Sequence, residues 1–156
     1  DNLLNLYHSN GMPVVRVYGP PNLEKRGGTI AFNLLDSQGH FFDYRRVEML
    51  ASRVNISLRT GCFCNPGTGE IVHDLTRDEM ESCFTGNPIS FEALFELAKQ
   101  SGKSPSAIRI SVGLVSNFAD IYRFMHFIET FVNREAYEIN SLPVIATTGS
   151  LSRDAA

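Results

Sequence analysis

The segment TIAFNLLD, residues 29–36, decides the fold prediction. It is an apolar, partly β-branched run that stops at the turn residues 37–39, so it predicts a strand. The run AIRISVG, residues 107–113, alternates in the manner of a strand with one buried face. Two further runs, at 13–19 and 56–60, also predict strands. The chain therefore contains four short predicted strands.

Helices are predicted between and after these strands. Asp43 is placed to cap one helix, and Asn117 is placed to cap the longest, over about 118–134. Shorter helices are predicted at 77–84 and 90–100. The side chains expected to face the core are Tyr44, Val47, Leu50, Ala51 and Val54 in the first of these helices and Ile121, Tyr122, Met125, Ile128 and Val132 in the longest.

The order β-β-α-β-loop-α-α-β-α lacks the regular strand–helix alternation of a parallel doubly wound sheet. We therefore predict an α+β fold, in which a small mixed or antiparallel sheet has helices packed on one face. Residues 1–137 form the predicted domain. Residues 138–156 show no periodicity and are predicted to be a disordered tail or a linker.

Composition narrows the class of protein. The chain has 156 residues, 43% of them apolar and 20% charged, which suits one globular domain. A net charge of −3 argues against a nucleic-acid partner, and no apolar run approaches the ~18 residues that would span a membrane. Three cysteines without a secretory signal favour a reducing, cytoplasmic compartment. Because the chain begins at Asp1 rather than Met, we expect a processed chain or a fragment.

The loop after the third predicted strand carries the clearest chemical signal. It reads GCFCNPGTG over 61–69 and presents Cys62 and Cys64 among glycine and proline. A cysteine thiolate is a strong nucleophile, and Arg59 is near enough in sequence to favour it. The alternative is that both cysteines are small buried hydrophobes.

A zinc site is a further alternative for the same cysteines. Cys62, Cys64, His73 and Cys83 could supply a Cys3His set, but a single residue between the first two ligands is unusual for structural zinc. We therefore predict no metal site. The other three histidines, at positions 8, 40 and 126, are interpreted as structural.

Arg109 is the second candidate for a functional residue. It lies in the middle of a predicted strand, between Ile108 and Ile110, so the isoleucines share one face and Arg109 lies on the other. If that face is covered, the arginine needs an anion, and a planar guanidinium suits a carboxylate. If the face is solvated, Arg109 needs no partner.

These motifs together resemble those of a known family. The stretch RTGCFCNPG at 59–67 resembles the cysteine loop of molybdenum cofactor sulfurases, and its RTGxxC frame is similar to that of cysteine desulfurases. The segments at 107–113 and 116–118 resemble the strand that carries a carboxylate-binding arginine and the start of the last helix. Residues 26–32 resemble the strand that opens the small domain.

The resemblance implies the C-terminal, small domain of a class V aminotransferase-type enzyme with the aspartate-aminotransferase fold. It implies that Cys64 accepts sulfur from cysteine as a persulfide, that Arg109 and Arg59 bind the substrate, and that Cys62 relays the sulfur. The sulfur acceptor would be a species such as molybdenum cofactor. The parent enzyme would be cytoplasmic and homodimeric.

The family cofactor is pyridoxal phosphate (PLP), held mainly by an N-terminal large domain. None of the three lysines here, Lys25, Lys99 and Lys103, stands in the context of its Schiff base, so we expect no cofactor-binding residue on this chain and no activity from it alone. The sulfurase loop usually continues NPGAC, whereas this chain has NPGTG at 65–69. The alternatives are a class V aminotransferase, epimerase or lyase domain without sulfur chemistry, and a non-catalytic partner-binding or sulfur-carrier domain.

Overall fold

A computed structural model of the chain describes residues 2–20, 24, 27–61, 103–104 and 106–143. The predicted helices at 77–84 and 90–100 lie outside these residues. The described elements, in chain order, are η1 (Asn2–Asn5), β1 (Val15–Tyr18), β2 (Thr29–Leu34), α1 (Tyr44–Arg53), β3 (Arg59–Gly61), β4 (Ala107–Ser111), α5 (Phe118–Glu129) and α6 (Ala136–Asn140).

The four strands form one sheet in the order β1-β2-β4-β3, and each neighbouring pair is antiparallel. One register row runs across the sheet, from Val17 to Phe32, then to Ile108 and Thr60. Because side chains alternate between the faces of a strand, this row marks one face. The α+β prediction is confirmed, and the sheet is antiparallel.

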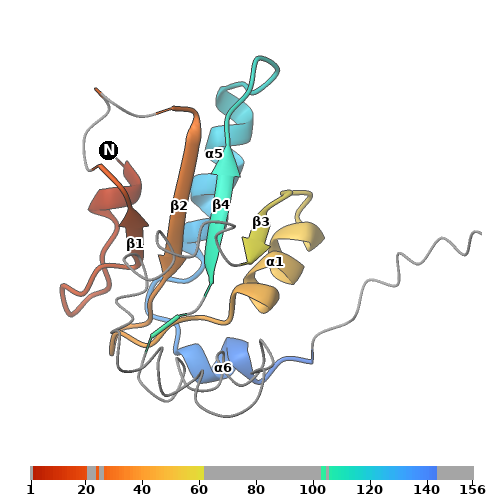
Figure 1. Cartoon of the computed structure of the whole chain (residues 1–156). Coiled ribbons are helices and arrows are strands. Elements are labelled where there is room, and N and C mark those ends of the chain that lie inside the picture. Colours follow the sequence, from red (N-terminus) through yellow and green to blue (C-terminus); the bar gives the residue numbers. More distant parts are fainter. Residues whose placement is uncertain (1, 21–23, 25–26, 62–102, 105, 144–156) are drawn as a thin grey trace, which may run out of the picture.

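The apolar face of the sheet is packed against α5, which lies behind β2 and β4 in Figure 1. The Phe32 and Phe124 rings meet edge to face, with 6.0 Å between their centroids. The helix α1 adds Val47 and Ala51 to the same core. The helices therefore share one core with this face, as predicted.

The longest helix ends earlier than its apolar pattern predicts. Asn117 caps α5 as expected, and Asp120 completes a capping box. The helix stops at Glu129 rather than 134, where the Thr130 hydroxyl donates to the Phe127 carbonyl at 2.6 Å. The turn that follows brings Phe131 into the core.

The buried face of α5 also differs from the predicted one. The structure buries Phe124, Phe127 and Ile128. Ile121 and Tyr122, which the helical spacing assigned to the core, are 42% and 64% exposed. The helix is turned so that Phe124 and Phe127 face the core together with Ile128, because burying these two large apolar side chains removes much apolar area from water.

The strand ends are set by pairing rather than by composition. The prediction begins the third strand at residue 56, but β3 begins at Arg59, where pairing with β4 begins. The strand β4 ends at Ser111, after which the Val112 amide donates to the Gly28 carbonyl at 2.8 Å. A Cβ atom at Gly28 would lie 2.8 Å from the Val112 carbonyl oxygen, so this approach requires glycine.

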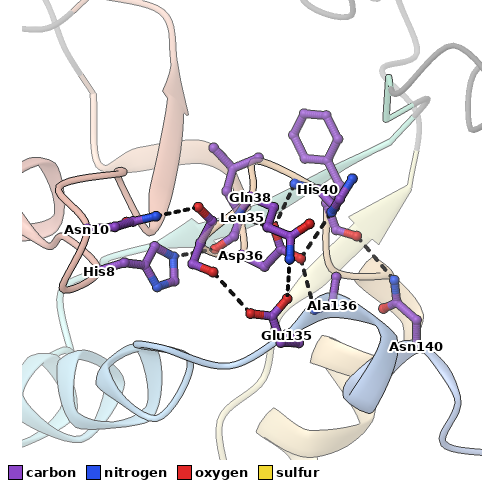
Figure 2. A network of polar contacts seen from close by, with 11 residues as sticks. His8, Asn10, Leu35, Asp36, Gln38, His40, Glu135, Ala136 and Asn140 are labelled. Carbon is purple, nitrogen blue, oxygen red and sulfur yellow. Dashed lines mark hydrogen bonds and ion pairs between the residues drawn. The ribbon is translucent and has the colours of Figure 1, made fainter.

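The helix α6 begins where the predicted domain ends. The Ala136 amide donates to the Asp36 carboxylate at 3.1 Å, and Asn140 donates to the Phe41 carbonyl at 3.2 Å (Figure 2). Asn140 also accepts from the Asp43 amide at 2.6 Å. The predicted tail, 138–156, therefore starts inside a packed helix. Residues 144–156 lie outside the described residues, and the assignment of a domain to 1–137 stays a prediction.

Candidate functional site

The face of the sheet opposite the core carries three arginines. We call it the arginine face and define it by Arg16, Tyr18, Asn33, Arg59 and Arg109. Strand register places Arg59 directly opposite Arg109, and Arg109 opposite Ala31, which in turn faces Tyr18. Directly opposed side chains have Cβ atoms roughly 4.5–5.5 Å apart. Two candidate site residues, 50 positions apart in the chain, are thus neighbours across β3 and β4.

The predicted alternation along β4 is confirmed. Ile108 is fully buried, and Ile110 packs against the same core. Arg109, on the other face, is half-buried, whereas Arg59 is exposed. The sequence left open whether this face is solvated or covered. In the structure Arg109 has an intermediate exposure, so the face is neither fully solvated nor fully covered at this residue.

Neither Arg59 nor Arg109 forms an ion pair within the described residues. The guanidinium of Arg16, by contrast, lies over the Tyr18 ring, 5.8 Å from its centroid. Like charges that face each other across a sheet are destabilising, and a half-buried charge favours a counterion. The pair Arg59–Arg109 is therefore suited to an anion, and its planar guanidinium groups suit a carboxylate.

Two hydrogen-bonded polar side chains, those of Tyr18 and Asn33, adjoin the arginines on the same face. The Asn33 amide donates to the Tyr18 hydroxyl at 2.9 Å and to the Ser106 carbonyl at 2.8 Å. Burial raises the pKa of the Tyr18 phenol, and Arg16 and the Asn33 hydrogen bond offset this only in part. Tyr18 is therefore neutral at physiological pH, and neither Tyr18 nor Asn33 adds a negative charge to the site.

The predicted nucleophile follows β3 directly in the sequence. Gly61, the last described residue of the strand, has φ +124°, a left-handed backbone conformation that favours glycine. Cys62 and Cys64 come next in the chain and lie outside the described residues, as do His73 and Cys83. The roles predicted for these four residues stay predictions.

The described residues give little to hold a metal or PLP. Among them, no group of three or more histidine, cysteine, aspartate or glutamate side chains could bind a metal ion. The four strands carry no lysine, and Lys103 is the one lysine within the described ranges. The arginine face thus fits the carboxylate of a substrate, but it offers no amine to a PLP aldehyde. Within the part of the chain that the structure describes, no helix is long and apolar enough to cross a bilayer.

Sequence reasoning missed part of the arginine face. Arg16 and Tyr18 lie two residues apart in β1, and Asn33 interrupts the apolar run of β2. The alternation of VRVY at 15–18 contains this signal, because Val15 and Val17 belong to the apolar face. The position of the buried Asn33 beside Tyr18 required the strand register.

The described histidines have local partners. His8 is buried: its Nε2 is 2.9 Å from the Leu35 carbonyl, and its Nδ1 accepts from the Asn133 amide. Because Nδ1 accepts, Nε2 is the nitrogen that donates to the Leu35 carbonyl. The other two contact acidic side chains, His40 with Asp36 at 3.3 Å and His126 with Glu129 at 3.2 Å.

Comparison with known proteins gives a consistent group of relatives. The chain is 36% identical over 157 aligned positions to molybdenum cofactor sulfurase of Oryza sativa subsp. japonica, with 93% of the chain covered. It is 40% identical to the Arabidopsis thaliana sulfurase and 33% identical to the Homo sapiens sulfurase, with 79% and 81% of the chain covered. No protein-family model matches the chain. No solved structure matches it either.

These relatives are much longer than the chain. The aligned part makes up 19% of the rice protein, 15% of the Arabidopsis protein and 14% of the human protein. The similarity therefore concerns one segment of each relative, and it includes the strands that carry Arg59 and Arg109 in this chain. The chain is homologous, over most of its length, to one segment of the molybdenum cofactor sulfurases.

Proposed function

We propose that the chain is the small domain of a PLP-dependent sulfurase that takes sulfur from cysteine and passes it to an acceptor such as molybdenum cofactor. The observation that carries this proposal is the pairing of Arg59 with Arg109 on one face of the sheet, in the short strand β3 that is followed directly by Cys62 and Cys64 in the sequence. The names of the relatives support the sulfurase class. The cytoplasm is the proposed site of action.

Arg109 is the proposed anchor of the substrate carboxylate. Its strand is held between β2 and β3, and the side chain is half-buried, so the guanidinium has a restricted position. Arg59 adds a second positive charge beside it, which favours an anionic substrate and a thiolate form of Cys64. Cys64 is three positions after Gly61 in the chain, so the Cα atoms of the two residues lie within about 11 Å of each other.

Cys64 is the proposed sulfur acceptor. Its thiolate forms an S–S bond with the sulfur of the substrate cysteine, and the substrate C–S bond breaks. The electron pair of that bond goes to the substrate carbon, which takes up the proton of the substrate thiol and leaves as the methyl group of alanine. The transferred sulfur remains on Cys64 as a persulfide, oxidised at the expense of that carbon. Cys62 is the proposed relay for this sulfur.

PLP supplies the electron sink for this reaction when it is bound. The lysine that would hold it belongs, in this proposal, to a large domain outside this chain, because none of Lys25, Lys99 and Lys103 stands in the sequence context of a Schiff-base lysine. The partner of the chain is therefore the large domain of the same enzyme, in a homodimeric holoenzyme. The chain alone is expected to release no alanine from cysteine.

The proposal is tested by replacing the nucleophile in the full-length sulfurase that contains this segment. Cys64→Ser should abolish the alkylatable persulfide and alanine release from cysteine, because serine cannot form the S–S bond. Cys62→Ser is the matched control, and it should still form alanine. Persulfide is measured by alkylation and mass spectrometry of the peptide, and the PLP absorbance reports that the cofactor site is intact.

Full sulfur release by Cys64→Ser would overturn the proposal. Turnover of an amino acid without sulfur by that variant would instead support a class V aminotransferase, epimerase or lyase. A second test uses Arg109→Gln, which should raise KM for cysteine far more than it lowers kcat. Arg16→Gln removes the same charge from the arginine face, two strands away, and should leave KM unchanged.

A further inference from the structure

A side-chain hydrogen bond joins β3 to α1, and the proposed function does not use it. The Thr60 hydroxyl donates to the Glu48 carboxylate at 2.6 Å. We propose that Glu48 and Thr60 are positioning residues of the substrate site, because their hydrogen bond fixes the register of β3 and thereby holds Arg59 opposite Arg109. This inference rests on the proposed function, since it takes Arg59 to bind the substrate.

The register of β3 is weakly specified by the sheet alone. The strand has three residues and lies at the edge of the described sheet, where β4 is its neighbour. A slip of one residue moves every side chain of a strand to the other face of the sheet. Such a slip would carry Arg59 from the arginine face to the core side and would put Thr60 in its place.

The position of Thr60 on the core side of β3 is unusual for a polar residue. Ile56 and Leu58 pack against the apolar core, and Thr60 is the next residue on that side of the chain. It pairs with Ile108, which is fully buried. An aliphatic residue at this position would continue the apolar pattern. Threonine instead supplies a hydroxyl, and Glu48 supplies its acceptor.

The helix α1 holds the segment that contains β3 at two points. At the start of the segment, the Ile56 amide donates to the Ala51 carbonyl at 2.9 Å. At its end, the Thr60 hydroxyl donates to Glu48. Ala51 is fully buried, so the helix is itself fixed in the core beside β3 (Figure 1). The contact at Thr60 forms only when this side chain faces α1, and Arg59 then lies on the opposite face.

The chemistry of this contact makes it a strong one. Hydrogen bonds from a hydroxyl to a carboxylate, at roughly 2.5–2.7 Å, are about twice as strong as those between neutral groups. Thr60 and Glu48 are both half-buried, so water competes less for either group than it would at the surface. Glu48 forms no ion pair with another described residue, and within this part of the chain its carboxylate serves Thr60.

Hydrogen–deuterium exchange in the full-length sulfurase tests whether the contact fixes β3. Thr60→Val keeps the branched side chain but removes the hydroxyl, so exchange of the peptide 56–61 should become several-fold faster, whereas exchange of β1 should not change. Thr60→Ser keeps the hydroxyl and should exchange as the wild type does. Ser37→Ala is the matched control, because it removes another hydroxyl-to-carboxylate hydrogen bond, to Glu135 at 3.1 Å, and it should leave the peptide 56–61 unchanged.

Steady-state kinetics with cysteine test the consequence for the substrate site. Thr60→Val should raise KM about fivefold and should lower kcat by less than about twofold, because Arg59 is proposed to bind the substrate. Glu48→Ala should change KM in the same direction. Thr60→Ser and Ser37→Ala should both retain the KM of the wild type.

A double-mutant cycle distinguishes positioning from a general loss of stability. In the Arg59→Gln background, Thr60→Val should raise KM no further, because the charge that Thr60 positions has been removed. An equal rise in KM with and without Arg59 would overturn the proposal.

Two other results would also overturn it. One is unchanged exchange of the peptide 56–61 in Thr60→Val, and the other is an unchanged KM in a variant whose exchange is faster. The exchange measurement involves no sulfur chemistry, and Cys64→Ser tests the sulfur chemistry without altering Glu48 or Thr60. Failure of this inference is therefore distinguishable from failure of the proposed function.

Discussion

Asp36 and Arg109 are both charged side chains that are at least partly buried, but they differ in the partners that the described structure gives them. Asp36 is 1% exposed, and its carboxylate accepts from the backbone amides of Gln38, His40 and Ala136 at 2.8–3.1 Å (Figure 2). Its second oxygen also lies 3.3 Å from the His40 ring. Arg109 is half-buried, and within the described residues it has no carboxylate partner.

The difference separates a charge that the protein itself compensates from one that its described residues leave uncompensated. A buried charge is tolerated only where hydrogen bonds or counterions replace its lost hydration. The protein supplies all of these groups to Asp36, which ties the end of β2 to the start of α6. It supplies no carboxylate from its described part to Arg109, so Arg109 is open to a counterion within that part of the structure. The proposed substrate carboxylate meets that need.

The largest effect is expected when the Asp36 network is broken. Asp36→Ala leaves three buried or partly buried amides without an acceptor and removes the cap of α6. The free energy of unfolding should fall by about 3 kcal/mol or more. Urea denaturation at neutral pH measures it. His40→Ala, which removes one exposed and long contact of the same carboxylate, should cost less than about 1 kcal/mol.

The same network should show in the pH dependence of stability. Burial raises the pKa of Asp36, but the hydrogen bonds from His40, Ala136 and Gln38 outweigh it and hold the pKa below its ordinary value. The ionised carboxylate therefore stabilises the folded state. This stabilisation is fully present above pH ~3.9, the pKa of Asp in an unfolded chain, and it is lost as the pH falls through the lower pKa that Asp36 has in the folded protein.

Asp36→Asn has no carboxylate to titrate and serves as the reference. Wild type should be more stable than Asp36→Asn by a constant free energy of unfolding from pH 7 to about 5. Below about pH 4 this advantage of the wild type should become smaller. Asp43, whose pKa is also lowered, is present in both proteins and cancels. A difference that does not change with acidification would contradict the charged network.

Local signals predicted much of this fold. Asp43 and Asn117 begin helices because their side chains accept from amides two or three residues ahead, which is a property of the adjacent sequence. The alternation of AIRIS likewise placed Ile108 in the core and Arg109 on the opposite face, because strand geometry has a period of two. Each of these predictions needs only a few consecutive residues.

The features that sequence reasoning missed depend on distant parts of the chain. The first amide of α6, that of Ala136, donates to the Asp36 carboxylate 100 residues away, a contact that the sequence near Ala136 does not signal. The pairing of Arg59 with Arg109 depends on strand order and register, which the resemblance did not supply. The rotation of α5 followed from competition between two apolar stripes for one core, which helical spacing alone does not decide.

Arg59 tests whether the arginine pair carries a cost to folding. Arg59→Leu should raise the free energy of unfolding by about 0.5 kcal/mol at low salt, because it removes a like charge directly opposite Arg109. The gain should shrink as salt is added. Arg16→Leu should have the opposite sign, since it removes the cation–π contact with Tyr18. A loss of stability in Arg59→Leu would indicate a counterion supplied by the chain itself.

Ser106 is the smallest test of the same contrast. Its side chain is fully buried, and its hydroxyl has no hydrogen-bond partner within the described structure, so it resembles Arg109 rather than Asp36. Ser106→Ala should leave stability unchanged or raise it by up to about 0.5 kcal/mol, because an unsatisfied polar atom is removed. Asn33→Ala, which breaks two hydrogen bonds next to Ser106, should cost about 2 kcal/mol. If Ser106→Ala were as costly as Asn33→Ala, the Ser106 hydroxyl would have a hydrogen-bond partner in solution, and its contrast with Asp36 would not hold.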